Sequence, residues 1–132
     1  MNRVLVLGGG FGGIATARRL KQKLGDAVDV ILVDRRDYFM VGFRKTWALV
    51  GESSLDEGQK PLESLRRLGV DVRRATIESL HPQERSATVS GERIQADALV
   101  VALGAETIPN AVPGFAEHAH NVYNPDDIPR AA

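Results

Sequence analysis

The sequence predicts an α/β fold in which the strands of a parallel sheet alternate with helices. Short runs of valine, leucine and isoleucine recur along the chain without polar alternation, which is typical of strands buried on both faces. Glycines and prolines bound these runs, and a pattern with helical spacing separates the first two of them. The 132 residues, of which 43% are hydrophobic, suffice for an ordinary core. We therefore expect one folded unit.

The first part of the chain predicts a βαβ unit. Val4–Leu7 is a short apolar run and is predicted to be a strand. Apolar residues at helical spacing predict a helix over 14–24, and Gly25 supplies a C-terminal stop. Val28–Val33 predicts a second buried strand that ends at Asp34. We therefore expect a right-handed crossover between these two strands and a sheet that is parallel at its centre.

The pattern is weaker over 37–60, where Trp47–Val50 predicts a short helix and a turn follows it. Pro61 is expected to open a further helix, which Gly69 ends. Val70–Val72 then predicts a third parallel strand. The alternation of helix and strand thus continues along the chain.

Three short β-rich runs follow, and they predict an antiparallel meander in place of a crossover helix: Thr76–Leu80, Ser86–Ser90 and Arg93–Ala96. Ala98–Leu103 predicts a fourth parallel strand, and the tail after Gly104 is expected to be mostly irregular. The predicted fold is therefore a Rossmann-like, doubly wound parallel sheet with a three-stranded antiparallel β-meander crossover.

Composition excludes several classes of function. The 17 basic and 17 acidic residues balance, so no net field attracts nucleic acid, and no nucleic-acid partner is expected. The chain contains no cysteine, so any electrons that move here must be carried by a bound cofactor. No apolar run approaches the roughly 20 residues of a membrane span, and we expect a cytoplasmic domain.

A glycine-rich motif stands where the first predicted strand ends and the first helix begins. Gly8, Gly10 and Gly13 have the spacing GxGxxG. Gly8 suits a tight turn, Gly10 allows the backbone to approach a pyrophosphate, and Gly13 allows the helix to pack closely on the strand. The candidate cofactor-binding residues in this segment are Gly8, Gly9, Gly10, Phe11, Gly12 and Gly13.

Asp34 ends the second strand 21 positions after Gly13. A carboxylate there can accept hydrogen bonds from an adenosine ribose and would repel a 2′-phosphate, which favours FAD or NAD over NADP. Arg35 and Arg36 follow, and either guanidinium is a candidate to stack on the adenine. The structural alternative is that the glycines only form a tight turn and Asp34 only begins the next one.

The run from Asp97 to Gly104 resembles the second flavin motif of two-dinucleotide-domain flavoprotein reductases, which usually contains Ala-Thr-Gly. Leu103 stands at the threonine position, whereas Ala102 and Gly104 match the motif. Because Ala102 and Gly104 are small, the backbone can still approach the cofactor closely at this motif. The resemblance implies FAD as the cofactor.

Three further segments, 34–39, 47–51 and 108–114, resemble sulfide:quinone reductases and type II NADH:quinone oxidoreductases of the pyridine nucleotide-disulfide oxidoreductase superfamily. The resemblance implies that the backbone of Ile77 holds the adenine, and that the loop carrying Arg44 and Lys45 lies along the pyrophosphate and flavin. A solvated loop is the alternative for this basic pair. Trp47 is expected in the core.

The chemistry of the intact protein is only partly predicted. A catalytic cysteine of sulfide:quinone reductases would be expected near 118–123, and its absence weighs against sulfide oxidation. His81, His118 and His120 are expected to be solvated, so no metal site is predicted. No catalytic residue is assigned.

The resemblance also implies that residues 1–132 are the N-terminal part of an FAD-binding domain, truncated before an NAD(P)H-binding insertion. Asp126 and Asp127 then stand where a helix begins. The expected partners are the dinucleotide, the remainder of the same polypeptide and, through an open sheet edge, a second copy. The intact protein would be peripheral to a membrane. Two alternatives remain: an NAD-binding module of a dehydrogenase or regulatory sensor, and a non-catalytic nucleotide-binding domain.

Overall fold

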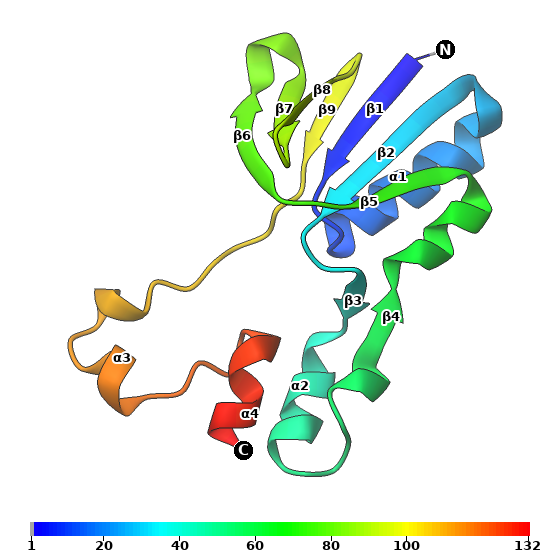
Figure 1. Cartoon of the computed structure of the whole chain (residues 1–132). Coiled ribbons are helices and arrows are strands. Elements are labelled where there is room, and N and C mark those ends of the chain that lie inside the picture. The colour runs from blue at the N-terminus through cyan, green and yellow to red at the C-terminus, as the bar shows by residue number, and fades with distance from the viewer. Residues whose placement is uncertain (1) are drawn as a thin grey trace. The chain divides into compact units, whose positions relative to one another are not determined.

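The computed structural model describes residues 2–132. Contacts within the chain divide it into two compact units (Figure 1). The first unit comprises the residues up to Phe39 together with Pro61–Gly104, and the second comprises Met40–Lys60 and Ala105–Ala132. We expected one folded unit. The division has a physical basis, because nearly all fully buried apolar side chains belong to the first unit.

The first unit is built on a four-stranded parallel sheet. Its strands are β1 (Asn2–Leu7), β2 (Val28–Asp34), β5 (Val70–Arg74) and β9 (Ala98–Val101), in the order β5-β2-β1-β9. The four predicted parallel strands are therefore confirmed, although β9 ends two residues earlier than predicted. β5 and β9 are the edge strands of this sheet.

The register aligns the carboxyl ends of the central strands. Leu7 of β1 lies opposite Val33 of β2 and Val101 of β9. The loops that follow these strands therefore leave the sheet on the same edge. In open α/β sheets this edge is where ligands bind.

One face of the sheet is covered by helices. α1 (Phe11–Leu24) begins within the glycine motif. The 3-10 helix η3 (Leu62–Leu68) begins shortly after the segment Met40–Lys60, which belongs to the second unit. They enclose a core of alternate strand residues with the helix residues Ala17, Leu62 and Leu65. Both predicted helices are confirmed, and α1 begins earlier than predicted because residues of the motif form its first turn.

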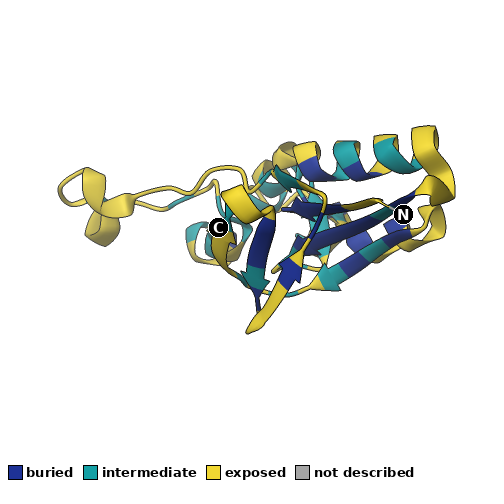
Figure 2. Cartoon of the chain, turned by 90° about the horizontal axis from the view of Figure 1, so that it is seen from above, coloured by how far each residue is buried: buried dark blue, intermediate teal, exposed yellow. Residues whose placement is uncertain are grey.

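The other face is covered by the meander, which consists of β6 (Ile77–His81), β7 (Ser86–Val89) and β8 (Glu92–Gln95). Its apolar side chains pack with the remaining alternate strand residues, including Leu5 and Ile31. The central strands β1 and β2 are accordingly buried along most of their length, whereas the edge strand β9 is partly exposed (Figure 2). The predicted antiparallel crossover is confirmed.

The structure also contains a two-stranded ribbon that was not predicted. β3 (Tyr38–Met40) pairs with β4 (Gln59–Pro61). Each strand has only three residues, so neither contains enough alternation to be distinguished from a loop.

The second unit contains short helical elements. α2 (Gly42–Leu49) is longer than the predicted helix, and it is accompanied by five short elements: η2 (Asp56–Gly58), η5 (Pro109–Ala111), α3 (Phe115–His118), η6 (Pro125–Asp127) and α4 (Ile128–Ala131). The tail is thus more regular than predicted. A helix does begin near Asp126 and Asp127 and completes one turn, in which Ile128 is buried.

The prediction that Trp47 lies in the core is wrong. Trp47 is 48% exposed, and Phe43, one helical turn earlier in α2, is 76% exposed. The guanidinium of Arg44 lies 4.9 Å from the Trp47 ring centroid. Among the helices of residues 2–132, none has the length and apolar character needed to cross a membrane.

Candidate dinucleotide site

Two glycines of the motif are required by the fold itself. Gly8 has φ 107°, and a Cβ there would lie 2.3 Å from the Ala102 carbonyl oxygen. A Cβ at Gly13 would lie 1.7 Å from the Gly8 carbonyl oxygen. Real Cβ atoms do not approach oxygen this closely, so each position admits only glycine. The strand-to-helix turn is therefore held tightly against β9 and α1.

Gly10 is different. It is the N-cap of α1, with φ −84° and ψ −165°, an extended conformation open to any residue. A Cβ at Gly10 would meet no atom within 4 Å. Among residues 2–132, neither the backbone conformation nor a neighbouring atom requires glycine at this position. A ligand that approaches the backbone closely would explain it, as predicted for the pyrophosphate.

The first turn of α1 offers hydrogen-bond donors. No side chain caps the helix, and its first turn contains no acidic residue. The first N–H groups of a helix lack intrahelical acceptors and attract anions. Gly12 is exposed, and 70% of the surface of Phe11 is accessible. The arrangement fits a phosphate at the carboxyl end of β1.

Asp34 lies beside this turn at the end of β2. Its Oδ2 accepts a hydrogen bond from the Gly9 N–H over 2.6 Å, and its Oδ1 accepts one from the Arg36 N–H over 2.7 Å. A carboxylate has about four acceptor positions, so about two remain for ribose hydroxyls. Asp34 therefore lies next to the glycine motif, and its role toward a ribose remains a prediction.

The two arginines after Asp34 are placed at the same edge of the sheet. Arg35 is exposed, and Arg36 is partly buried. Nearby, Arg74 at the end of β5 forms an exposed ion pair with Asp37 over 3.2 Å. Stacking of Arg35 or Arg36 on an adenine remains a prediction.

Ala102, predicted from the second flavin motif, is brought against the glycine turn. Its N–H donates to the Leu7 carbonyl over 2.8 Å, and its carbonyl oxygen faces Gly8. Gly104 lies two residues further on, with φ 76°. Ile77 lies at the start of β6 and packs on the core beneath the meander. Their predicted contacts with FAD remain untested.

The predicted basic pair Arg44 and Lys45 belongs to the second unit. The Lys45 ammonium donates to the Tyr123 carbonyl and lies 4.6 Å from the Tyr123 ring centroid. Arg44 covers Trp47, as described above. Both cations thus have partners within their own unit, and a phosphate contact by Lys45 remains a prediction.

Two residues that support the glycine turn were not predicted. The Leu62 side chain packs on Gly9, where a Cβ would lie 2.5 Å from Leu62 Cδ1. Phe39 packs edge-on against Phe11, with ring centroids 4.7 Å apart. Leu62 follows a proline in an apolar pattern, which predicted burial but not this contact. Nothing in the sequence paired Phe11 with Phe39.

The histidines do not form a site. His81 lies within 3.1 Å of Ser79 Oγ and 3.2 Å of Thr88 Oγ1 on the meander, whereas His118 and His120 are exposed. His81 is thus partly buried rather than solvated. Within residues 2–132, no group of three or more histidine, cysteine or acidic side chains is placed to hold a metal.

Charge elsewhere in the first unit is structural. The hydrogen bond that Arg66 donates to Glu63, together with the charges of Glu63 and Asp71, raises the pKa of Arg66 above its usual range. Arg66 also donates to the Val72 carbonyl, which ties η3 to β5. Because arginine is charged at all ordinary pH values, this shift adds no pH dependence.

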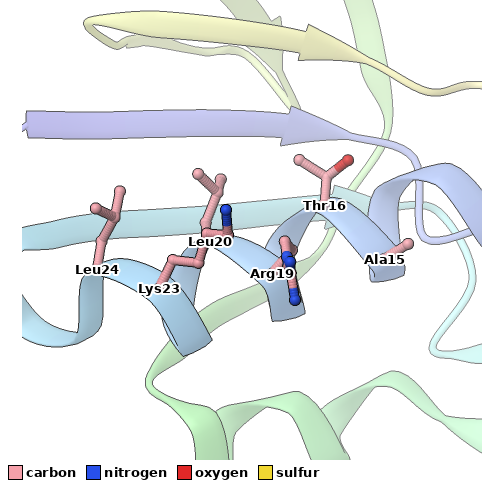
Figure 3. A pocket seen from close by; sticks show the side chains of 6 residues that line it. All are labelled: Ala15, Thr16, Arg19, Leu20, Lys23 and Leu24. Atoms are coloured by element: carbon pink, nitrogen blue, oxygen red, sulfur yellow. The ribbon is translucent and has the colours of Figure 1, made fainter.

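A groove runs along α1, away from the glycine turn (Figure 3). Thr16, Leu20 and Leu24 project on one side of it, and Arg19 and Lys23 contribute positive charge. It shares no residue with the motif. It is therefore separate from the candidate dinucleotide site.

Fold and site together define a class: a Rossmann-like α/β domain with a glycine-rich turn at the carboxyl edge of its sheet. The family model of the pyridine nucleotide-disulphide oxidoreductases matches residues 2–130, and the chain belongs to this family.

Known relatives agree with this assignment. The chain is 34% identical to an alternative NAD(P)H-ubiquinone oxidoreductase of Arabidopsis thaliana, over 97% of this chain and 28% of the relative. It is 27% identical to a type II NADH:quinone oxidoreductase of Staphylococcus saprophyticus, over 92% and 31%. The structure of the sulfide:quinone oxidoreductase of Aquifex aeolicus superposes with a TM-score of 0.90 at 26% identity, over 99% and 30%. The chain thus spans about a third or less of these proteins.

Proposed function

We propose that this chain binds the ADP half of FAD at the carboxyl edge of β1 and β2. The observation that carries the proposal is the contrast among the motif glycines. Glycine is required by the fold at positions 8 and 13. At Gly10 a side chain would meet no described atom within 4 Å, so no contact within residues 2–132 accounts for the glycine. Family membership supports a dinucleotide as the ligand that fills it.

Each residue of the site has a distinct task in this proposal. The N–H groups of the first turn of α1 bind the pyrophosphate, and Gly10 permits its approach. The free acceptor positions of Asp34 bind the ribose hydroxyls and exclude a 2′-phosphate. Ala102 and Gly104 follow β9 and continue the contact surface along the cofactor. Bound FAD would supply the redox chemistry.

For the intact protein we propose an FAD-dependent oxidoreductase that passes electrons from NAD(P)H to a quinone. The relatives in Arabidopsis and Staphylococcus carry such activities in their names. Other relatives are named as sulfide:quinone reductases. The absence of cysteine from residues 1–132 favours the NAD(P)H-dependent activity over sulfide oxidation.

The alternative of an NAD-binding module shares the glycine motif and Asp34. Such a module does not need a meander as the last crossover of its sheet, and the structure contains one. The meander and the family assignment favour FAD.

The test is a titration of the purified chain with FAD, followed by flavin fluorescence, with NAD titrated in parallel. We expect FAD to bind in preference to NAD, and weakly, because the chain spans about a third or less of its relatives and further contacts to the flavin are expected from the rest of the polypeptide. Binding of NAD alone would move the assignment to the dehydrogenase or sensor. Binding of neither would contradict the proposal for this chain.

We also propose that the isolated chain self-associates. β5 and β9 are edge strands, and exposed edges offer unpaired backbone groups to a second chain. Sedimentation velocity at increasing concentration tests this: association is expected, and a monomer throughout would contradict it.

A further inference from the structure

We propose that Asp34 is a positioning residue that holds the glycine turn in its phosphate-binding conformation, in addition to any contact with a ribose. The inference rests on the proposed function for its ligand. Its structural part depends only on contacts within the first unit.

The carboxylate extends the pairing of β1 with β2 beyond the ends of the strands. The Gly8 N–H donates to the Val33 carbonyl over 2.8 Å. The next N–H, that of Gly9, donates to the Asp34 side chain over 2.6 Å. The backbone carbonyl of Asp34 is directed to the β5 side of β2, where it accepts the Ala75 N–H over 2.9 Å, and not toward Gly9. The side chain thus takes the place of a backbone acceptor.

The carboxylate is itself fixed. While Oδ2 binds Gly9, Oδ1 accepts the Arg36 N–H over 2.7 Å, so both oxygens are held and the side chain cannot rotate freely. Gly9 is buried, and Leu62 packs on it. Removing the carboxylate would leave the Gly9 N–H without its acceptor beside an apolar side chain.

The hydrogen bond between Gly9 and Asp34 lies one residue from the proposed phosphate site. Gly9 precedes Gly10, the N-cap from which α1 starts. Fixing Gly9 therefore fixes where the first N–H groups of α1 point. A residue that only bound ribose hydroxyls would have no effect on a ligand that lacks them.

The experiment uses ADP and 2′,3′-dideoxy-ADP as probes, titrated by NMR or calorimetry into the full chain. The variants are Asp34→Ala, which removes both acceptors, and Asp34→Asn, which keeps one. Asp37→Ala is the matched control, because it removes a carboxylate three residues away that is exposed and paired with Arg74. The control also measures the effect of net charge, which by itself would tighten the binding of an anion.

We expect Asp34→Ala to weaken dideoxy-ADP by about fivefold or more, from the loss of a hydrogen bond to a charged acceptor. Asp34→Asn should give a smaller loss, and Asp37→Ala should change binding by less than about twofold. If Asp34→Ala weakens ADP but leaves dideoxy-ADP unchanged or tighter, Asp34 acts on the ribose alone and the inference is overturned.

Failure of the proposed function is distinguishable. If the unaltered chain binds neither probe, that function fails for this chain, and amide exchange without ligand decides the inference. Faster exchange at Gly9 and Gly10 in Asp34→Ala and Asp34→Asn than in Asp37→Ala supports the positioning role. Equal exchange rates in these variants overturn it.

Discussion

The first unit buries apolar side chains on both faces of its sheet, whereas the second unit leaves most of its large apolar side chains exposed. Val6 and Leu32 in the first unit are inaccessible to solvent. In the second unit Phe43 is 76% exposed, and Ile128 is the fully buried apolar residue. Burial of apolar surface is the main favourable term in folding. The first unit therefore contributes most of the stability of this chain, and the glycine turn is part of that unit.

The largest expected effect is that of Gly13→Ala. A methyl group would overlap the Gly8 carbonyl, so either α1 or β1 must move, which we expect to cost about 3 kcal/mol or more. Urea denaturation followed by circular dichroism measures the change. Gly12→Ala is the control, because a Cβ there makes an ordinary 3.6 Å contact with Ala102 and alanine favours a helix. Equal stability of the two variants would contradict the close packing of the turn.

Leu32→Ala and Trp47→Ala compare the two units directly. Leu32 is fully buried in the sheet, and its truncation should cost about 2 to 5 kcal/mol. Trp47 is half exposed, so its truncation should cost less than about 1 kcal/mol although more atoms are removed. The same denaturation experiment measures both. A larger loss for Trp47→Ala would show that the second unit contributes a core of its own.

Hydrogen exchange should sharpen the comparison without any substitution. Amides of β1 and β2 lie in the centre of the sheet and should exchange only with global unfolding. Amides of α2 and α4 should exchange faster, because their helices bury little apolar surface. Mass spectrometry of peptides from each unit measures the difference. Uniform protection would contradict the division.

The smallest expected effect is that of Asp37→Ala on stability. The Arg74–Asp37 ion pair is exposed on both sides, and such pairs contribute little. We expect a change within about 0.5 kcal/mol in denaturation. A larger loss would show that the turn after β2 depends on this charge.

The parts of the fold that were predicted are those with strong local patterns. Val28–Val33 is apolar throughout, and the spacing of Gly8, Gly10 and Gly13 fixes a strand-to-helix turn, so both were predictable from a few adjacent residues. The β3–β4 ribbon was missed because its strands have three residues each. Trp47 was misplaced because an aromatic side chain in a helix predicts burial only when another apolar surface is present to cover it.

The candidate site shows the same limit. The sequence assigned Asp34 to the candidate cofactor site from its position at the end of the second predicted strand, and Ala102 from the resemblance to the second flavin motif. It did not predict that Asp34 binds Gly9 or that Leu62 packs there, since these contacts depend on side-chain positions in three dimensions. Lys45 was assigned from its loop alone, and its contact with Tyr123 joins residues far apart in the chain.

The most direct test of the central claim is FAD binding by Gly10→Ala, measured by flavin fluorescence beside a thermal unfolding curve. A methyl group at Gly10 would meet no atom of residues 2–132 within 4 Å apart from its chain neighbours, so stability should stay within about 0.5 kcal/mol of the original chain. The same methyl group would stand where the pyrophosphate approaches, and FAD affinity should fall by about tenfold or more. Unchanged FAD affinity at unchanged stability would contradict the assignment of this turn as the FAD site.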